Sequence, residues 1–184
     1  NHLGHFALTG RLLDAVTDRV VTVSSGLHER GGIDFADVHG EESYDKWDAY
    51  AQSKLANLLF AYELDRRAEF LTSVGAHPGY AATNLQYRGP QESGSRRKYA
   101  MMKVLNGVVA QSARKGTLPM LYAATAPDVE GGEYYGPGGL LNMRGYPERQ
   151  ESNDASYDEA DSEQLWEVSE NLTGVSYAFE KLVA

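Results

Sequence analysis

A short β-branched run between two helical stretches constrains the fold of this chain more than any other feature. Val20, Val21 and Val23 lie in the run RVVTV, and the polar Ser-Ser-Gly that follows ends it. Short, nearly continuous apolar runs are typical of strands that are buried on both faces of a parallel sheet. Because parallel strands are joined by crossover segments that usually hold a helix, this run predicts an α/β protein.

Helical and extended patterns alternate along the rest of the chain, which supports that class. An Ala- and Leu-rich stripe predicts a long helix from about Trp47 to Phe70. Pro119 should kink or break a helix that it interrupts, and Gly174 should end the last one. Further helices are expected over residues 1–16, 98–110, 112–126 and 158–174, and further short strands within 71–80 and 131–139. We expect one domain, residues 1–184, with a parallel sheet and flanking helices.

Composition and charge exclude several classes of function. The formal net charge is −9, so the chain would repel the phosphate backbone and no nucleic-acid partner is expected. There is no Cys, and His2 and His5 have no third ligand at a suitable spacing, so no metal site is expected. Apolar runs such as 104–110 are too short for a membrane span, and no secretory signal is recognisable. We expect a cytoplasmic protein.

A tyrosine followed four residues later by a lysine is the candidate for chemistry. Tyr50 and Lys54 have this spacing in DAYAQSKLAN, which places both side chains on one face of a helix. A Tyr is a poor acid or base near neutral pH, but an ammonium group within about 4–6 Å favours the phenolate. The same spacing recurs at Tyr99 with Lys103 and at Tyr177 with Lys181. Spacing alone therefore cannot identify a catalytic pair.

The surroundings of Tyr50 distinguish it from the other two tyrosines. Ser24 and Ser25 end the strand that precedes its helix, and the next strand ends at HPG, residues 77–79. In open α/β sheets ligands bind outside the carboxyl ends of the strands, where a hydroxyl could hold a substrate oxygen beside the phenol. Either serine could supply that hydroxyl. We expect His77 to serve in packing or backbone hydrogen bonding rather than in catalysis.

Four phrases in one order, NHLGHF, RVVTVSSG, YAQSK and HPGYAAT, make this chain resemble the short-chain dehydrogenase/reductases. The resemblance is closest to the branch of retinol dehydrogenases and protochlorophyllide reductase-like oxidoreductases. It is close over residues 1 to about 85 and looser beyond. It implies a Rossmann-like doubly wound sheet and an oxidoreductase that uses NADP or NAD, with NADP slightly favoured. A hydride would pass between the nicotinamide and a small-molecule carbonyl or alcohol substrate.

The resemblance also implies a role for each catalytic candidate. Tyr50 would be the general acid/base, and Lys54 would favour the phenolate and hydrogen-bond the nicotinamide ribose. Ser25 would orient the substrate oxygen, since the family pattern favours it over Ser24. Asn1 would hold a water molecule that links Lys54 to solvent.

Cofactor contacts are implied for the segment after the second strand. The Pro78-Gly79 turn would let the backbone approach the nicotinamide carboxamide, at Ala81, and Thr83 would contact the carboxamide or a phosphate. Thr83 could equally cap a helix. Residues 84–110 would form the substrate-loop region, and the long helix with Tyr50 could pack against a second subunit in a homo-oligomer.

One departure from the family pattern concerns the cofactor. The Thr-Gly-x-x-x-Gly-x-Gly turn that receives the pyrophosphate does not occur, and GPGG at 136–139 follows the wrong strand. We therefore expect a fragment that holds the C-terminal, catalytic half of the fold, with the N-terminal dinucleotide-binding βαβ part absent. Two alternatives stay open. One is a non-catalytic truncated remnant that acts as a structural or interaction module, and the weaker one is a sugar-nucleotide epimerase-type member.

Overall fold

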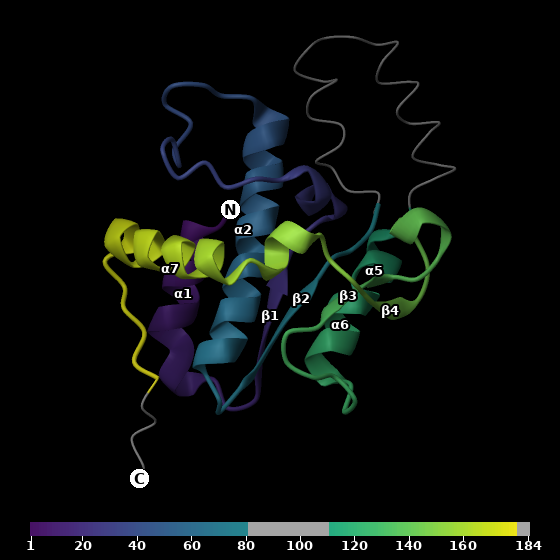
Figure 1. Cartoon of the computed structure of the whole chain (residues 1–184). Coiled ribbons are helices and arrows are strands. Elements are labelled where there is room, and N and C mark those ends of the chain that lie inside the picture. The colour runs from purple at the N-terminus through teal and green to yellow at the C-terminus, as the bar shows by residue number, and fades with distance from the viewer. Residues whose placement is uncertain (81–110, 180–184) are drawn as a thin grey trace.

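A mixed sheet with helices on both faces organises the fold (Figure 1). The computed structural model describes residues 1–80 and 111–179. The strands lie in the order β1 (Arg19–Val23), β2 (Thr72–Ala76), β3 (Tyr134–Pro137) and β4 (Pro147–Gln150). The first three are parallel and β4 is antiparallel. The predicted α/β class and Rossmann-like parallel sheet are confirmed.

The helices follow the predicted order. They are α1 (Leu3–Leu12), α2 (Lys46–Arg67), α5 (Ala113–Gly116), α6 (Leu118–Thr125) and α7 (Glu159–Thr173). Thr117 separates α5 from α6, with Pro119 in the first turn of α6, so the break predicted there is confirmed. Gly174 ends α7 in the left-handed conformation, as predicted. The expected helix at 98–110 and the substrate-loop region 84–110 lie outside the described residues.

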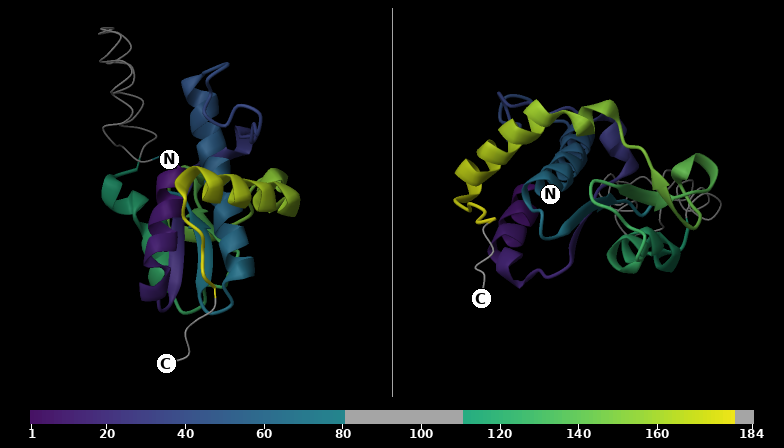
Figure 2. Two further views of the ribbon diagram at one scale, coloured as in Figure 1. Left: turned by 90° about the vertical axis from the view of Figure 1, so that its left-hand side faces the viewer. Right: turned by 60° about the horizontal axis from the view of Figure 1, so that its bottom comes forward.

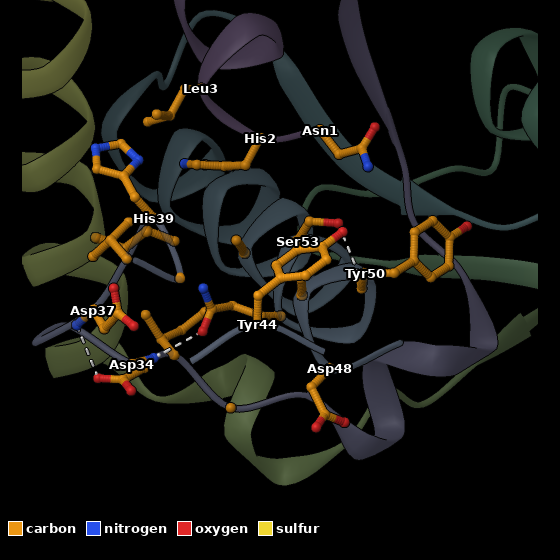
Figure 3. Close-up of a pocket in the computed structure, with 18 of the residues that line it drawn as sticks. Asn1, His2, Leu3, Asp34, Asp37, His39, Tyr44, Asp48, Tyr50 and Ser53 are labelled. Atoms are coloured by element: carbon orange, nitrogen blue, oxygen red, sulfur yellow. Dashed lines mark hydrogen bonds between the residues drawn. The ribbon is translucent and has the colours of Figure 1, made fainter. Parts of the chain in front are cut away.

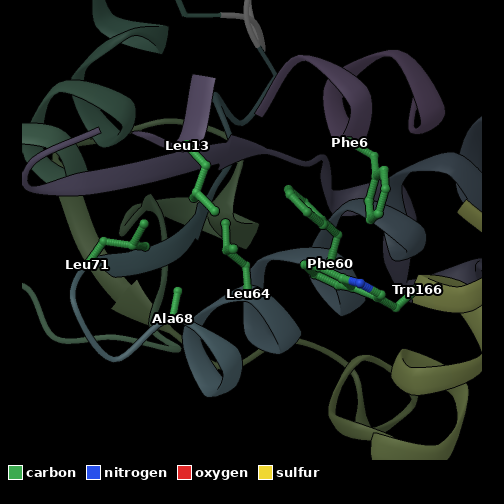
Figure 4. Close-up of a cluster of buried hydrophobic side chains, with 7 residues drawn as sticks. All are labelled: Phe6, Leu13, Phe60, Leu64, Ala68, Leu71 and Trp166. Carbon is green, nitrogen blue, oxygen red and sulfur yellow. The ribbon is translucent and has the colours of Figure 1, made fainter. Parts of the chain in front are cut away.

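The two faces of the sheet are covered by different helices. Val20 of β1 contacts a cluster from α1, α2 and α7 that contains Phe6, Phe60 and Trp166 (Figure 4). Val21, the next residue, contacts the cluster on the α6 face instead. This alternation is the two-residue period of a strand, and it confirms the doubly wound arrangement.

Helix α2 is the central element of the structure. Asp45 caps it by accepting hydrogen bonds from the backbone N–H groups of Trp47 and Asp48 at 2.7 and 3.2 Å. Every residue from Lys54 to Leu64 is buried, because the sheet packs under α2 and α7 crosses its outer side (Figure 2). The carboxyl end of β1 thereby lies beside the middle of α2.

Strand β1 is less buried than its composition predicts. Within the described residues it pairs only with β2, and its end residue Val23 is 42% exposed. The prediction of a strand buried on both faces is wrong for this part of β1, because nothing in the described part of the chain covers its outer edge.

Among the described residues, none of the helices combines the length and the apolarity that crossing a bilayer needs.

Candidate functional site

The end of β1 is fastened to one turn of α2 by three hydrogen bonds. The carbonyl oxygen of Val23 accepts from Lys54 Nζ at 3.1 Å and from Asn57 Nδ2 at 3.0 Å. Ser24 Oγ donates to the carbonyl oxygen of Lys54 at 2.8 Å. These bonds hold the strand end against the helix one turn after Tyr50.

Tyr50 and Lys54 are neighbours on α2, as their spacing predicts. Lys54 Nζ lies 5.5 Å from the centre of the Tyr50 ring. Lys54 is only 8% exposed, and burial lowers the pKa of its ammonium group. In the described part of the chain no carboxylate pairs with Lys54 and no hydrogen bond engages the Tyr50 phenol. The pair thus combines a partly desolvated cation with a phenol that can bind another molecule.

The structure distinguishes Ser24 from Ser25, either of which could by sequence supply the hydroxyl that holds a substrate oxygen. Ser24 is 2% exposed and its hydroxyl donates within the core to the Lys54 carbonyl, so it cannot face a substrate. Ser25 is only partly buried, and its Oγ accepts from the Leu27 N–H at 3.3 Å at the start of a 3₁₀ turn, Gly26–Arg30. Its O–H can therefore still donate outward. No hydrogen bond joins the Ser25 hydroxyl to the Tyr50 phenol.

The turn after β2 lies at the same edge of the sheet. Gly79 has a φ of +64°, which favours glycine, and the carbonyl oxygen of Pro78 accepts from Gln111 Nε2 at 2.8 Å. Tyr80 N–H donates to the carbonyl oxygen of Met143 at 2.7 Å. The turn is therefore held in place from the C-terminal side of the chain. Ala81 and Thr83, the other predicted cofactor contacts, lie outside the described residues, as do Tyr99, Lys103 and Lys181.

His77 has the structural role that the sequence indicates. Its ring stacks on Tyr134, with ring centres 5.2 Å apart, and it is 3% exposed. Tyr177 is also structural, since its ring packs on Phe6 and its hydroxyl donates to the Phe6 carbonyl at 2.5 Å.

A cavity of about 870 Å³ opens between the start of α1, residues 30–45, α2 and α7 (Figure 3). Among the candidate residues that the structure describes, only Asn1 and Tyr50 line it. The Tyr50 ring points away from the other side chains drawn there. Asn1 is exposed, and no hydrogen bond connects it to Lys54. We therefore place the candidate chemistry at the strand ends, with the cavity beside it.

Sequence reasoning missed two buried polar residues at this site, Asn57 and His28. Asn57 is fully buried and shares the Val23 carbonyl with Lys54. A polar residue three positions after Lys54, within the apolar stripe of the helix, was the available signal. His28 gives no such signal, because its hydrogen-bond partners include Asn153, which is far away in the sequence.

Comparisons with known proteins show several similar sequences and a similar solved structure. Retinol dehydrogenase 14 of Mus musculus is 35% identical over 95% of this chain and 51% of its own length. Polyprenol dehydrogenase of Homo sapiens is 33% identical over 95% of this chain and 53% of its own length. A crystal structure of an uncharacterized protein from Mycobacterium Paratuberculosis is 37% identical, with a TM-score of 0.75, over 97% of this chain and 58% of that chain. No family model matches the sequence.

The fold and the similar solved structure define a Rossmann-like α/β protein. Its relatives include retinol and polyprenol dehydrogenases, in agreement with the four ordered motifs. The chain belongs to the short-chain dehydrogenase/reductase family, in the branch that contains retinol dehydrogenases. It spans about half the length of the curated relatives that it matches.

Proposed function

We propose that this chain supplies the catalytic groups of an NAD(P)-dependent oxidoreductase acting on a small-molecule carbonyl or alcohol. The observation that carries the proposal is the buried Lys54 ammonium, which lies beside Tyr50 and is fastened to the end of β1. A lysine buried without a carboxylate partner costs stability, so its presence there favours a role other than stabilising the fold. Relatives named as retinol and polyprenol dehydrogenases support an alcohol or carbonyl as the reacting group.

The donor groups of this site fit the nicotinamide-ribose end of the cofactor. An ammonium group has three N–H donors, and Lys54 uses one on the Val23 carbonyl, so two can reach ribose hydroxyls. The fit does not extend to the pyrophosphate, because the sequence has no Gly-rich phosphate turn. We propose NADP or NAD as the cofactor, with NADP slightly favoured by the family resemblance.

Each residue would contribute one part of the proton transfer. The bound nicotinamide supplies or takes up the hydride at its C4. Tyr50 gives its phenolic proton to the carbonyl oxygen during reduction, or takes the alcohol proton during oxidation. Lys54 stabilises the phenolate by its charge, and the Ser25 O–H donates to the substrate oxygen as negative charge develops there. Asn1 would hold the water that returns a proton to Lys54.

Further assignments rest on family resemblance. We propose that Pro78, Gly79, Ala81 and Thr83 contact the nicotinamide and that residues 84–110 cover the substrate. A cytoplasmic location and a homo-oligomer that packs through α2 belong to the same proposal.

Replacement of Tyr50 tests the proposal in the full encoded protein. General acid–base catalysis contributes about 10²–10⁴-fold, so Tyr50→Phe should lower kcat by at least about 100-fold. The measurement is absorbance of the reduced cofactor with a panel of retinoid, polyprenyl and short-chain alcohols and aldehydes. Tyr122→Phe is the matched control, because it removes a hydroxyl bonded to Asp128 on the other face of the sheet. Equal activity in Tyr50→Phe and the wild type would refute the proposed role.

One observation favours a non-catalytic interaction module as the second candidate. Within the described residues the outer edge of β1 is unpaired, and an unpaired strand edge is a template for another chain. Calorimetry separates the two functions. A nucleotide that binds the native state raises the melting temperature. At a concentration 100-fold above Kd it adds about 2.7 kcal/mol to the free energy of unfolding. Absence of a shift with both NADPH and NADH would favour the interaction module.

A further inference from the structure

Two buried histidines pack against the same tyrosine, and each belongs to one of the candidate turns. His28 contacts the Tyr134 ring edge-on, with ring centres 5.3 Å apart, and His77 stacks on it at 5.2 Å. The three side chains are 2–3% exposed. His28 lies in the turn that begins at Ser25, and His77 directly precedes Pro78 and Gly79. Neither imidazole can reach a substrate, so any effect on the reaction must pass through these turns.

His28 holds the backbone of Ser25. Its Nδ1 lies 2.8 Å from the Ser25 carbonyl oxygen, which can only accept, so Nδ1 carries the proton. Its Nε2 accepts from the Asn153 N–H at 3.3 Å, and Asn153 Nδ2 donates to the His28 carbonyl at 3.1 Å. Glu29 Oε1 lies 3.5 Å from Nε2, but burial lowers the pKa of His28 and favours the neutral ring.

His77 holds the backbone of Gly79 in the opposite tautomer. Its Nδ1 accepts from the Gly79 N–H at 3.2 Å, and its Nε2 donates to Gln150 Oε1 at 2.9 Å. Gln150 Nε2 in turn donates to the Pro137 carbonyl at 3.0 Å. The ring has room only because residue 136 is glycine, where a Cβ atom would lie 1.8 Å from His77 Nε2.

Both histidines connect to one short segment, residues 150–153, which leaves β4 on the way to α7 (Figure 1). This segment also contacts α2, the helix of Tyr50 and Lys54, because Ser152 Oγ lies 2.8 Å from the Tyr62 hydroxyl. Ser152 Oγ is further bonded to Ser156 Oγ at 2.5 Å, and both are buried. Segment 150–153 therefore touches every element that presents a candidate residue at the strand ends.

We propose that His28 and His77 are positioning residues through which segment 150–153 holds the Ser25 turn and the Gly79 turn against α2. The inference rests on the proposed function and adds that the two histidines affect different steps. His28 acts on the hydroxyl that meets the substrate oxygen, so its loss lowers kcat. His77 acts on the turn that meets the nicotinamide, so its loss weakens cofactor binding. Misplacement of a reacting group by about 1 Å can lower the reaction rate about 100-fold, so a smaller displacement of either turn should lower kcat or cofactor affinity about tenfold.

The test uses the full encoded protein with two pairs of variants. His28→Phe keeps a ring against Tyr134 but removes both hydrogen bonds, and it should lower kcat about tenfold with the NADPH Kd unchanged. His28→Asn restores a donor to the Ser25 carbonyl and should recover most of kcat. His77→Phe should raise the NADPH Kd about tenfold with kcat at saturating cofactor nearly unchanged, and His77→Asn restores an acceptor for Gly79. Cofactor fluorescence measures Kd without turnover.

A control variant and an NMR measurement distinguish a positioning role from a merely structural one. Tyr135→Phe removes a buried hydrogen bond to Glu133 on the α6 face of the sheet and leaves the backbone at Tyr135 in place, so it should lower the melting temperature with kcat and Kd unchanged. Ring ¹⁵N shifts of the wild type without cofactor should show His28 protonated at Nδ1 and His77 at Nε2. The same tautomer in both rings, or wild-type kcat in folded His28→Phe, overturns the inference. Full activity of Tyr50→Phe in that assay would instead refute the proposed function.

Discussion

Acidification should destabilise this fold through the imidazole of His2, which is 8% exposed at the start of α1. Ser169 Oγ donates to the Leu165 carbonyl at 2.7 Å, so it accepts from His2 Nε2 at 2.8 Å, and the proton of the neutral ring is on Nε2. His2 Nδ1 is buried and makes no hydrogen bond within the described residues, and the rings of Phe6 and Phe60 lie 6.1 Å away. A second proton would place a positive charge in this buried, largely aromatic surrounding, where the Asn57 amide is the neighbouring polar group.

The size of the effect follows from the pKa of His2. Burial lowers this pKa from 6.5 to about 4, against an opposing effect of the neighbouring Asn57 amide. The folded pKa lies below the unfolded one, so the unfolded chain binds the proton first and stability falls as the pH drops from 6.5 through 4. Between pH 7 and pH 5 this single group should cost about 2 kcal/mol, and it approaches about 3 kcal/mol near pH 4.

Urea unfolding at pH 7 and pH 5 measures the loss, with fluorescence of Trp166 as the probe because its ring contacts Phe6 and Phe60. Burial shifts the pKa of His28 and His77 in the same direction, so the wild type should lose more than His2 alone explains. His2→Gln can still donate to Ser169 and should lose about 2 kcal/mol less than the wild type between the two pH values.

His39→Gln is the control, since it removes an exposed imidazole and leaves His2 in place, so this variant should keep the loss that His2 causes. Parallel losses in His2→Gln and the wild type would refute the reasoning, because they would show that the buried His2 ring does not resist protonation.

Two further predictions concern the stability of the fold, at Lys54 and at Gly75. Lys54→Met removes a buried charge while the Val23 carbonyl keeps its bond from Asn57, so the melting temperature should rise or stay unchanged while turnover is lost; a lower melting temperature with turnover intact would contradict this. Gly75→Ala would place a Cβ atom 2.6 Å from Leu58 Cδ2, between β2 and α2. It should cost about 1–3 kcal/mol in urea unfolding. Gly4→Ala in α1 should be neutral or stabilising, because the added Cβ atom would lie more than 4 Å from every atom outside its own stretch of helix. Equal losses in both variants would show that packing at Gly75 is not the cause.

Most of the fold could be predicted from the sequence because hydrophobic periodicity records burial directly. The stripe of α2 and the β-branched run of β1 predicted their elements to within a few residues. Strand β4, PERQ, was not predicted. It begins with proline, its other side chains are polar, none of its residues is buried, and within the described residues it pairs on one edge only, so no burial pattern marks it.

The site was predictable only where its geometry is local. The spacing of Tyr50 and Lys54 places them together on any helix, and the strand ends then distinguish this pair from Tyr177, whose ring belongs to the aromatic core. The bonds of His28 could not be predicted, because its partner Asn153 lies 125 residues away and the tertiary fold alone brings them together. The same holds for His77 and Gln150, which are 73 residues apart.

The burial of Lys54 connects the local and the distant parts of the site. A desolvated ammonium group is unfavourable by itself, and its place is fixed by the Val23 carbonyl, which Asn57 also engages. That carbonyl is the last of β1, two residues before Ser25, whose own carbonyl is held by His28. The phenol and the serine hydroxyl are thus carried by one continuous hydrogen-bonded frame. A charge on Tyr50 during proton transfer would be compensated by Lys54 without rearrangement of that frame, which is the condition under which preorganised charges are most effective.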